Sequence, residues 1–286
     1  MKRESFGSRL GFILVSAGCA IGIGNVWKFP YICGAYGGAA FILIYLCFLV
    51  ILGIPVLVAE FAVGRGSHTS VAKCFDKLAP AGSGWKPLKF IGIIGCYMLM
   101  MFYTTVGGWM IYYCVKSLRG DFVGATPEAV TQSFSDMLGN APTMMLWMVI
   151  ICLIGFAVCF MGLQNGIEKI SKVMMSALLI IMVILAVHSV MMEGAGEGIR
   201  FYLIPDFQKI KEAGVGNVVF AALSQSFFTL SIGIGAMLIF GSYLDKSRSL
   251  TGEAVSITVL DTFVALTAGF IIIPACFSYG IQLQGF

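Results

Sequence analysis

Two glycine-rich stretches inside apolar segments carry the backbone groups best suited to bind ions. Residues 18–25 read GCAIGIGN, and residues 231–235 repeat part of that pattern as SIGIG. Glycine weakens a helix by about 1 kcal/mol relative to alanine, so each stretch favours a local opening. In a bilayer, an opened turn is tolerated only where it faces protein or a wet cavity. Its carbonyl oxygens can meet a cation and its N–H groups an anion, so we predict that the two stretches frame a binding site.

Asp261 is the most informative single side chain, because it lies in the middle of an apolar segment. A carboxylate at the centre of a membrane helix costs about 2.5 to 3.5 kcal/mol and indicates a functional site by default. A structural aspartate bonded to backbone is the alternative.

His68 and His188 lie in different segments, with no cysteine or carboxylate at metal-ligand spacing. A phosphate-binding glycine loop with lysine is absent from the sequence as well, so nothing indicates an enzyme.

The composition identifies the kind of chain that must position these groups. Of the 286 residues, 59% are hydrophobic and 11% are charged, and the mean hydropathy is +0.94. Soluble domains carry about 25% charged residues, so this is an all-α, polytopic membrane protein. The nine cysteines lie mostly inside apolar runs and are expected to act as small hydrophobic residues. The net charge of +4 requires no nucleic-acid partner.

A bilayer core needs about 20 apolar residues per helix, and the apolar runs predict seven spans. Most of the Lys and Arg residues then lie on one side, which places the N-terminus in the cytoplasm. Residues 118–142 and 193–214 become outer loops, and neither contains a glycosylation sequon, which favours a bacterial source. The chain reaches Phe286 without a basic tail, and we expect it to be truncated. The predicted spans are residues 10–35, 38–64, 89–116, 143–162, 166–192, 214–242 and 252–284.

Ordered motifs occupy residues 9–14, 18–30, 37–41, 53–55, 60–65, 225–231 and the helix of Asp261. Together they resemble the motifs of the neurotransmitter:sodium symporters, especially bacterial amino-acid members of the leucine-transporter type. That resemblance implies two five-helix repeats of inverted topology, as is known for this family. Residues 1–192 would form the first repeat, with its first span broken near 19–24. Residues 193–286 would be an incomplete second repeat, broken near 229–233, so the chain corresponds to the N-terminal portion.

The resemblance implies a symporter that imports an amino acid with sodium by alternating access. One or two sodium ions would bind, without an organic cofactor. Asp261 stands where many relatives carry asparagine, and a carboxylate there implies that chloride is not required. The partners would be a small amino acid with an apolar side chain and the bilayer of the bacterial inner membrane; no feature indicates an oligomeric state. Two alternatives stay open, namely a ligand-binding or regulatory membrane protein without transport and an inert fragment.

The same resemblance assigns the ion and substrate ligands. The first sodium site would use Ala20, Asn25, Thr229 and Asp261, and half of a second site would use the carbonyls of Gly18 and Ile21. For Asn25 the alternative is a helix cap, and for Thr229 a hydroxyl bonded to its own helix. The substrate carboxylate would meet N–H groups of the first break and a tyrosine hydroxyl, and its amine would meet carbonyls of the second. The substrate-binding residues would be Ala20, Gly22, Gly24, Leu99, Tyr103, Phe228, Thr229, Ser231 and Ile234, although aliphatic residues such as Leu99 and Ile234 are often plain core.

Four further positions would act as gates or supports. Arg3 resembles an inner-gate arginine, with a positive-inside charge as the alternative. Lys28 stands where many relatives have an outer-gate arginine, but a lysine cannot offer the two-donor fork of a guanidinium group. Glu60 would brace the second break. Gln225 matches a residue of the chloride site of animal relatives and is expected here to supply hydrogen-bonding support.

Overall fold

The structure is a computed structural model that describes residues 6–281, and Arg3 therefore lies outside the described residues. The described part is helical, with connecting segments and no strand. Three short π-helical turns, η1, η2 and η3, interrupt or begin the longer apolar helices. In chain order the elements are α1 Arg9–Ala20, η1 Gly24–Lys28, α2 Phe29–Ala35, α3 Ala39–Phe48, η2 Leu49–Gly53, α4 Ile54–Ser67, α5 Val71–Leu78, α6 Leu88–Arg119, α7 Pro127–Gly139, α8 Ala141–Phe160, η3 Leu163–Glu168, α9 Lys169–Val190, α10 Ala195–Leu203, α11 Phe207–Ala213, α12 Val215–Thr229, α13 Ala236–Gly241 and α14 Leu250–Ser278.

Among the described residues, five continuous helices are long and apolar enough to cross a membrane. They are Ala39–Ser67, Leu88–Arg119, Ala141–Phe160, Leu163–Val190 and Leu250–Ser278. A sixth candidate consists of Arg9–Ala20 and Gly24–Ala35, which are bent by 57° at the break between them. The sixth predicted span, 214–242, consists instead of α12 and the short helix α13, separated by the non-helical residues 230–235. Neither helix alone is long enough to cross a bilayer.

The structure corrects the two segments that we predicted as loops. Residues 118–142 contain α7, although the polar composition of this segment indicated a loop. Thr126 is the N-cap of α7, and its hydroxyl accepts from the backbone N–H of Ala129 at 3.3 Å. Pro127 then occupies the first helical turn, where a missing N–H costs nothing. Residues 193–214 contain α10 and α11. The last span also ends earlier than predicted, at Ser278 rather than at residue 284, which lies outside the described residues.

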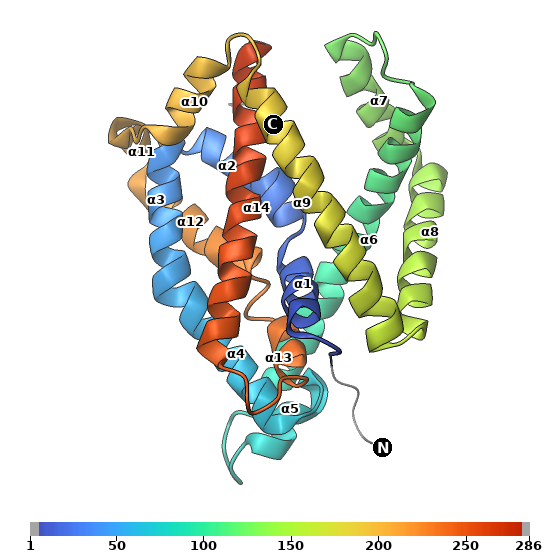
Figure 1. The fold of residues 1–286 in the computed structure, drawn as a ribbon, viewed down its shortest axis with the longest axis vertical. Helices are drawn as coiled ribbons and strands as arrows, with labels where there is room; N and C mark the ends of the chain where they lie inside the picture. Colours follow the sequence, from blue (N-terminus) through green and yellow to red (C-terminus); the bar gives the residue numbers. More distant parts are fainter. Residues whose placement is uncertain (1–5, 282–286) are drawn as a thin grey trace.

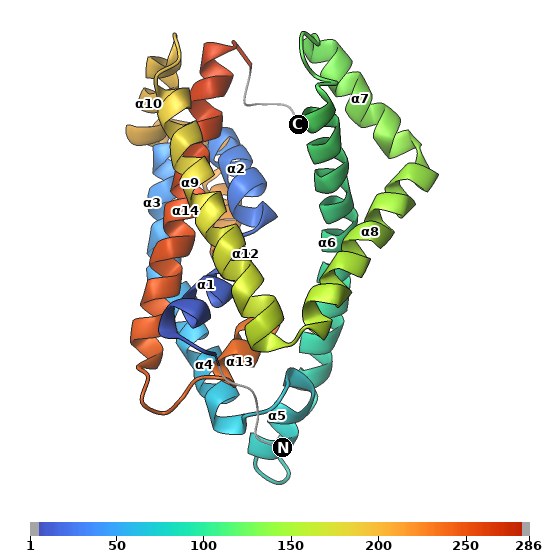
Figure 2. The same ribbon diagram turned by 45° about the vertical axis from the view of Figure 1, so that its right-hand side comes forward.

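Helix α14 occupies the centre of the bundle and packs against α1, α2, α4, α9 and α10. Helix α12 packs against α3, and α13 packs against α4. Figure 2 shows α6, α7 and α8 standing to one side of this bundle, where α6 and α8 pack on each other. In Figure 1, α5 lies at one end of the molecule and α7, α10 and α11 lie at the other.

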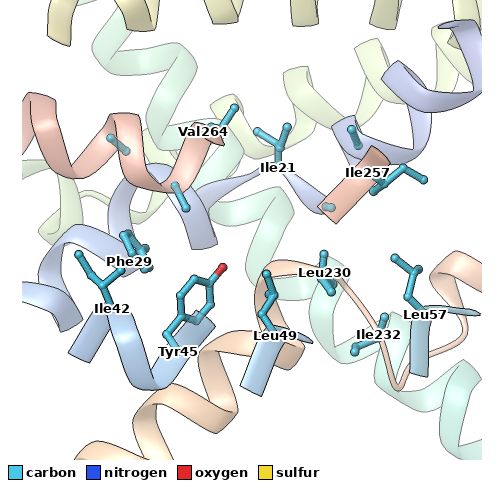
Figure 3. Packing of buried hydrophobic residues seen from close by; sticks show 14 of the residues in the cluster. Ile21, Phe29, Ile42, Tyr45, Leu49, Leu57, Leu230, Ile232, Ile257 and Val264 are labelled. Atoms are coloured by element: carbon cyan, nitrogen blue, oxygen red, sulfur yellow. The ribbon is translucent and has the colours of Figure 1, made fainter. Parts of the chain in front are cut away.

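The apolar core surrounds the two helix breaks. Figure 3 shows Ile21 from the first break and Leu230 and Ile232 from the second among buried side chains of the neighbouring helices. Close backbone contact between α4 and α13 depends on Gly64, because a Cβ atom there would collide with the carbonyl oxygen of Leu238. The breaks are therefore fixed by packing on several sides rather than exposed as loops.

Candidate functional site

The first break separates α1 from η1. Helix α1 ends at Ala20, and Ile21 adopts an extended conformation with φ −70° and ψ 110°. The helix resumes as a wide π-helical turn, Gly24–Lys28, a geometry that is frequent at functional sites. The glycines of this stretch explain the break, because each lowers the cost of leaving the helix.

The second break follows α12 and uses left-handed backbone conformations. Gly233 has φ 93° and Gly235 has φ 78°, which glycine adopts without steric cost. Ser231 has φ 52°, which is uncommon for a residue with a side chain. Its hydroxyl donates to the carbonyl oxygen of Cys19 at 3.0 Å, so this strained residue ties the second break directly to the first.

Asn25, Thr229 and Asp261 come together between the two breaks and α14. The amide nitrogen Nδ2 of Asn25 donates to Oδ1 of Asp261 at 2.8 Å and to Oγ1 of Thr229 at 3.0 Å. The hydroxyl of Thr229 donates to Oδ2 of Asp261 at 2.8 Å rather than to its own helix. The backbone N–H of Gly22 donates to Oδ1 of Asn25 at 3.3 Å. All three side chains of this cluster have 0% exposure.

The cluster contains one carboxylate and only neutral donors. The ion pairs seen among residues 6–281 join Arg9 to Glu253, Lys89 to Asp76 and Lys172 to Glu168, and none includes Asp261. A buried charge without a charged partner is costly, and hydrogen bonds from an amide and a hydroxyl offset only part of that cost. The arrangement is therefore suited to a small cation that oxygen atoms can surround.

Two polar side chains brace the breaks. Glu60 on α4 accepts from the backbone N–H of Gly233 at 2.6 Å and from that of Leu238 at 3.2 Å. Gln225 on α12 donates from Nε2 to the carbonyl oxygen of Gly24 at 2.9 Å. These bonds satisfy backbone groups that the interrupted helices leave unpaired.

A cavity of about 650 Å³ lies beside the cluster. Gly22 and Gly24 of the first break lie directly behind two residues of the cavity wall. A Cβ atom added at Gly22 would lie 3.4 Å from the hydroxyl of Tyr103, and one added at Gly24 would lie 2.7 Å from the Phe228 ring. Ala20 and Thr229 are buried and do not line it. The lining residues are Lys28, Gly95, Met98, Leu99, Phe102, Tyr103, Ser224, Phe227, Phe228, Ser231, Ile232 and Ile234.

Half of this lining was not predicted from the sequence. Gly95 lies four residues before Leu99 and Phe102 lies three after it, while Met98 lies four before Phe102. Ser224 lies four residues before Phe228, and Phe227 lies four before Ser231. That periodicity could have found them once Leu99 and Phe228 had been chosen.

The remaining predicted residues lie around or outside the cavity. The Nζ of Lys28 lies 4.2 Å from the centroid of the Phe228 ring, a cation–π contact between two residues that line the cavity. The backbone of Gly18 lies against Met175, and Ile21 packs in the apolar core. Neither Gly18 nor Ile21 belongs to the cluster of Asn25, Thr229 and Asp261.

Two interrupted helices that converge on a buried carboxylate and a cavity are typical of secondary transporters with broken helices. Comparison with known proteins agrees. The chain belongs to the sodium:neurotransmitter symporter family, whose sequence model matches residues 3–135 and 129–280.

Similar proteins are sodium-dependent transporters. A sodium-dependent transporter of Bacillus subtilis is 36% identical over 281 residues, which cover 98% of this chain and 61% of the relative. A sodium-dependent transporter of Methanocaldococcus jannaschii is 32% identical, over 94% of this chain and 55% of the relative. The crystal structure of MhsT in complex with L-phenylalanine is 38% identical with a TM-score of 0.91, and the match covers 99% of this chain and 64% of that one.

These comparisons confirm the predicted family and the all-helical, leucine-transporter-like fold. The matched relatives are transporters, which agrees with the prediction that the chain is not an enzyme. The chain spans about three fifths of the length of the relatives that it matches.

Proposed function

We propose that the protein is a sodium-coupled symporter that imports an amino acid by alternating access around the two helix breaks. The observation that carries this proposal is the cluster of Asn25, Thr229 and Asp261, whose buried carboxylate is hydrogen-bonded to a neutral amide and a hydroxyl and forms no ion pair among residues 6–281. Sodium is a hard cation, and hard cations prefer carboxylate, carbonyl and hydroxyl oxygens. The carbonyls of Ala20 and Thr229 would complete this first site, and those of Gly18 and Ile21 would supply half of a second.

The substrate would bind across the two breaks. N–H groups from Ala20 to Gly24 and the hydroxyl of Tyr103 suit a carboxylate, and carbonyls near Phe228, Thr229 and Ser231 suit an ammonium group. The position of Tyr103 beside Gly22 supports this assignment. An amino acid is also what MhsT holds in its crystal structure. Leu99, Phe228 and Ile234 would contact the substrate side chain.

Chloride would not be required, because an ionised Asp261 would itself supply a negative charge beside the sodium ligands. Gln225, which matches a residue of the chloride site in animal relatives, already donates to the carbonyl of Gly24. Its use as a support for the first break favours this chloride-independent mechanism.

Membrane placement and repeat assignment belong to the same proposal. The protein would lie in the bacterial inner membrane with a cytoplasmic N-terminus, and residues 1–192 and 193–286 would be parts of two inverted repeats. The position of α5 at one end and of α7, α10 and α11 at the other supports the predicted alternation of inner and outer segments.

Uptake into proteoliposomes tests the proposed function. The purified protein is reconstituted, and entry of radiolabelled L-phenylalanine is measured with an inward sodium gradient, with choline in place of sodium, and after gramicidin. One sodium ion driven by 100 mV and a tenfold gradient supplies about 2.3 plus 1.4 kcal/mol, so accumulation is expected in the first condition alone. Sodium-dependent binding without uptake would instead support a ligand-binding or regulatory membrane protein. The absence of both would contradict the proposal.

A further inference from the structure

The connection between α4 and α6 concentrates positive charge. Residues 65–89 contain five Lys and Arg residues and one acid, so their net charge of +4 equals that of the whole chain. The connection at residues 118–142 contains one basic and three acidic residues, which gives it a net charge of −2. The five cations of the first connection are Arg65, Lys73, Lys77, Lys86 and Lys89.

The single acid of this segment neutralises only one of the five cations. Asp76 accepts from Nζ of Lys89 at 2.8 and 2.7 Å through its two carboxylate oxygens. Lys77 donates to a backbone carbonyl at 2.8 Å, and a carbonyl leaves the positive charge of the ammonium group in place. Among residues 6–281, no carboxylate forms an ion pair with Lys73, Lys77 or Lys86. The segment therefore presents a surplus of positive charge.

Helix α5 holds two of these lysines in fixed positions. Val71 and Cys74 are buried on one side of the helix. Val71 packs against the second break so closely that a Cβ atom at Gly235 would lie 2.8 Å from its Cγ2. Lys73 and Lys77 are four residues apart, so they share one face of the helix, and both are exposed. A docked helix rather than a free loop therefore carries the two ammonium groups.

This segment lies at a membrane surface because it joins two consecutive spans. The span of α4 ends at Ser67 and that of α6 begins at Leu88, and α5 lies at one end of the molecule (Figure 1). Trp85 is 61% exposed, precedes Lys86 directly and lies three residues before α6. Tryptophan is enriched at the level of the lipid head groups, and the long stem of a lysine lets its ammonium group reach that level.

We propose that α5 and the loop that follows it bind the phosphate group of an anionic phospholipid through Lys73, Lys86 and Trp85. The two ammonium groups would meet the phosphate, and the exposed indole would lie beside the upper part of the acyl chains. Each lysine near an anionic lipid surface strengthens binding about fivefold, which corresponds to about 1 kcal/mol. An acidic protein or a nucleic acid would leave the exposed indole and its position beside a span unexplained. Because α5 packs against Gly235, the bound lipid would also steady the second break.

Quenching of Trp85 fluorescence by brominated lipids tests the proposal. The purified protein in detergent micelles is titrated with brominated phosphatidylglycerol, which is anionic, or with brominated phosphatidylcholine, which has no net charge. The signal of Trp85 is the difference between each protein and its Trp85→Phe version. Half-quenching by phosphatidylglycerol is expected at a concentration about 25-fold lower than by phosphatidylcholine, and Lys73→Gln combined with Lys86→Gln should reduce this preference about 25-fold.

The matched control removes two positive charges at the other end of the molecule. Arg119 at the end of α6 and Lys211 on α11 are both exposed, so Arg119→Gln combined with Lys211→Gln should leave the lipid preference unchanged. An equal loss in this control would assign the effect to net charge alone and overturn the site. Equal quenching by the two lipids in the wild type would overturn the proposal, as would an unchanged preference in the variant without Lys73 and Lys86.

A salt titration of the wild type keeps the proposal testable if the lysine variant does not fold in a melting assay. Salt screens exposed charges, so it should reduce the preference for phosphatidylglycerol and leave quenching by phosphatidylcholine unchanged. A preference that salt does not alter would overturn the proposal. The measurements use neither sodium gradients nor an amino acid, so a negative result would contradict the lipid site and not the proposed symport.

Discussion

Replacing Asp261 by asparagine tests the proposed sodium site most directly. The carboxylate of Asp261 accepts hydrogen bonds of 2.8 Å from Asn25 and from Thr229, and its side chain is fully buried. Asparagine has nearly the same shape and keeps one acceptor, so the change removes the charge with little change in packing. It also removes a buried carboxylate that forms no ion pair with a basic side chain among the described residues.

The expected loss of sodium-binding free energy in Asp261→Asn follows from the removal of one negative charge next to the ion. Two unit charges about 4 Å apart attract by about 4 kcal/mol at the effective dielectric of a protein site. Part of this attraction is lost to desolvation of the ion, so we expect sodium binding to weaken by about 2 to 4 kcal/mol. Since a tenfold change in affinity corresponds to about 1.4 kcal/mol, the sodium midpoint should rise roughly 30-fold to 900-fold.

Sodium titration of the melting temperature measures this change without requiring transport. A ligand at 100 times its dissociation constant stabilises a protein by about 2.7 kcal/mol, so sodium should raise the melting temperature of the wild type. Asp261→Asn should melt at the same temperature or higher in choline and should lose most of the sodium effect. Asp136→Asn provides the control, because Asp136 is exposed on α7 and bonds only Gln132 among the described contacts. An unchanged sodium midpoint in Asp261→Asn would refute the assigned site, as would an equal shift in the control.

Two further predictions concern the scaffold around the site. Gly64→Ala places a methyl group against the backbone of Leu238, so it should lower stability by about 1 to 3 kcal/mol, whereas Gly216→Ala, which meets nothing within 4 Å, should not. Thermal melting of the two variants compares them, and equal melting temperatures would contradict the close packing of α4 and α13. Arg9→Ala leaves the carboxylate of Glu253, whose side chain is 3% exposed, without its 2.9 Å partner. A loss of about 1 to 3 kcal/mol is expected, and Glu253→Gln in the same chain should restore most of it in the same melting assay.

The membrane spans could be predicted because the bilayer imposes a length and a composition on any helix that crosses it. The helices outside the spans could not be predicted in this way, because a helix of two or three turns repeats its buried face only two or three times, as Ala195, Gly198 and Tyr202 do in α10. Helix α7 depends on Thr126 and Pro127, a local start signal of two residues within a polar segment. Capping patterns should therefore be searched in every predicted loop.

The residues of the site also differ in how far the sequence alone could indicate them. Asp261 stood out because a carboxylate in an apolar segment is costly, and its neighbours Asn25 and Thr229 followed from the resemblance rather than from composition. The pairing of Arg9 with Glu253 joins residues 244 positions apart, and no pattern in either segment indicates it. Ser224 and Phe227 were missed because polar and aromatic residues at helical spacing are equally compatible with core packing.

Asn25 connects the proposed ion site to the proposed substrate site through its own amide. Its Oδ1 accepts from the backbone N–H of Gly22, while its Nδ2 donates to Thr229 and Asp261. A sodium ion beside Asp261 would need Oδ1 rather than Nδ2, because a cation is bound by oxygen. Turning the amide toward the ion releases the N–H of Gly22, which is then free to bind a substrate carboxylate. Sodium would in this way prepare the first break for the amino acid, and phenylalanine binding of equal strength in sodium and in choline would contradict this coupling.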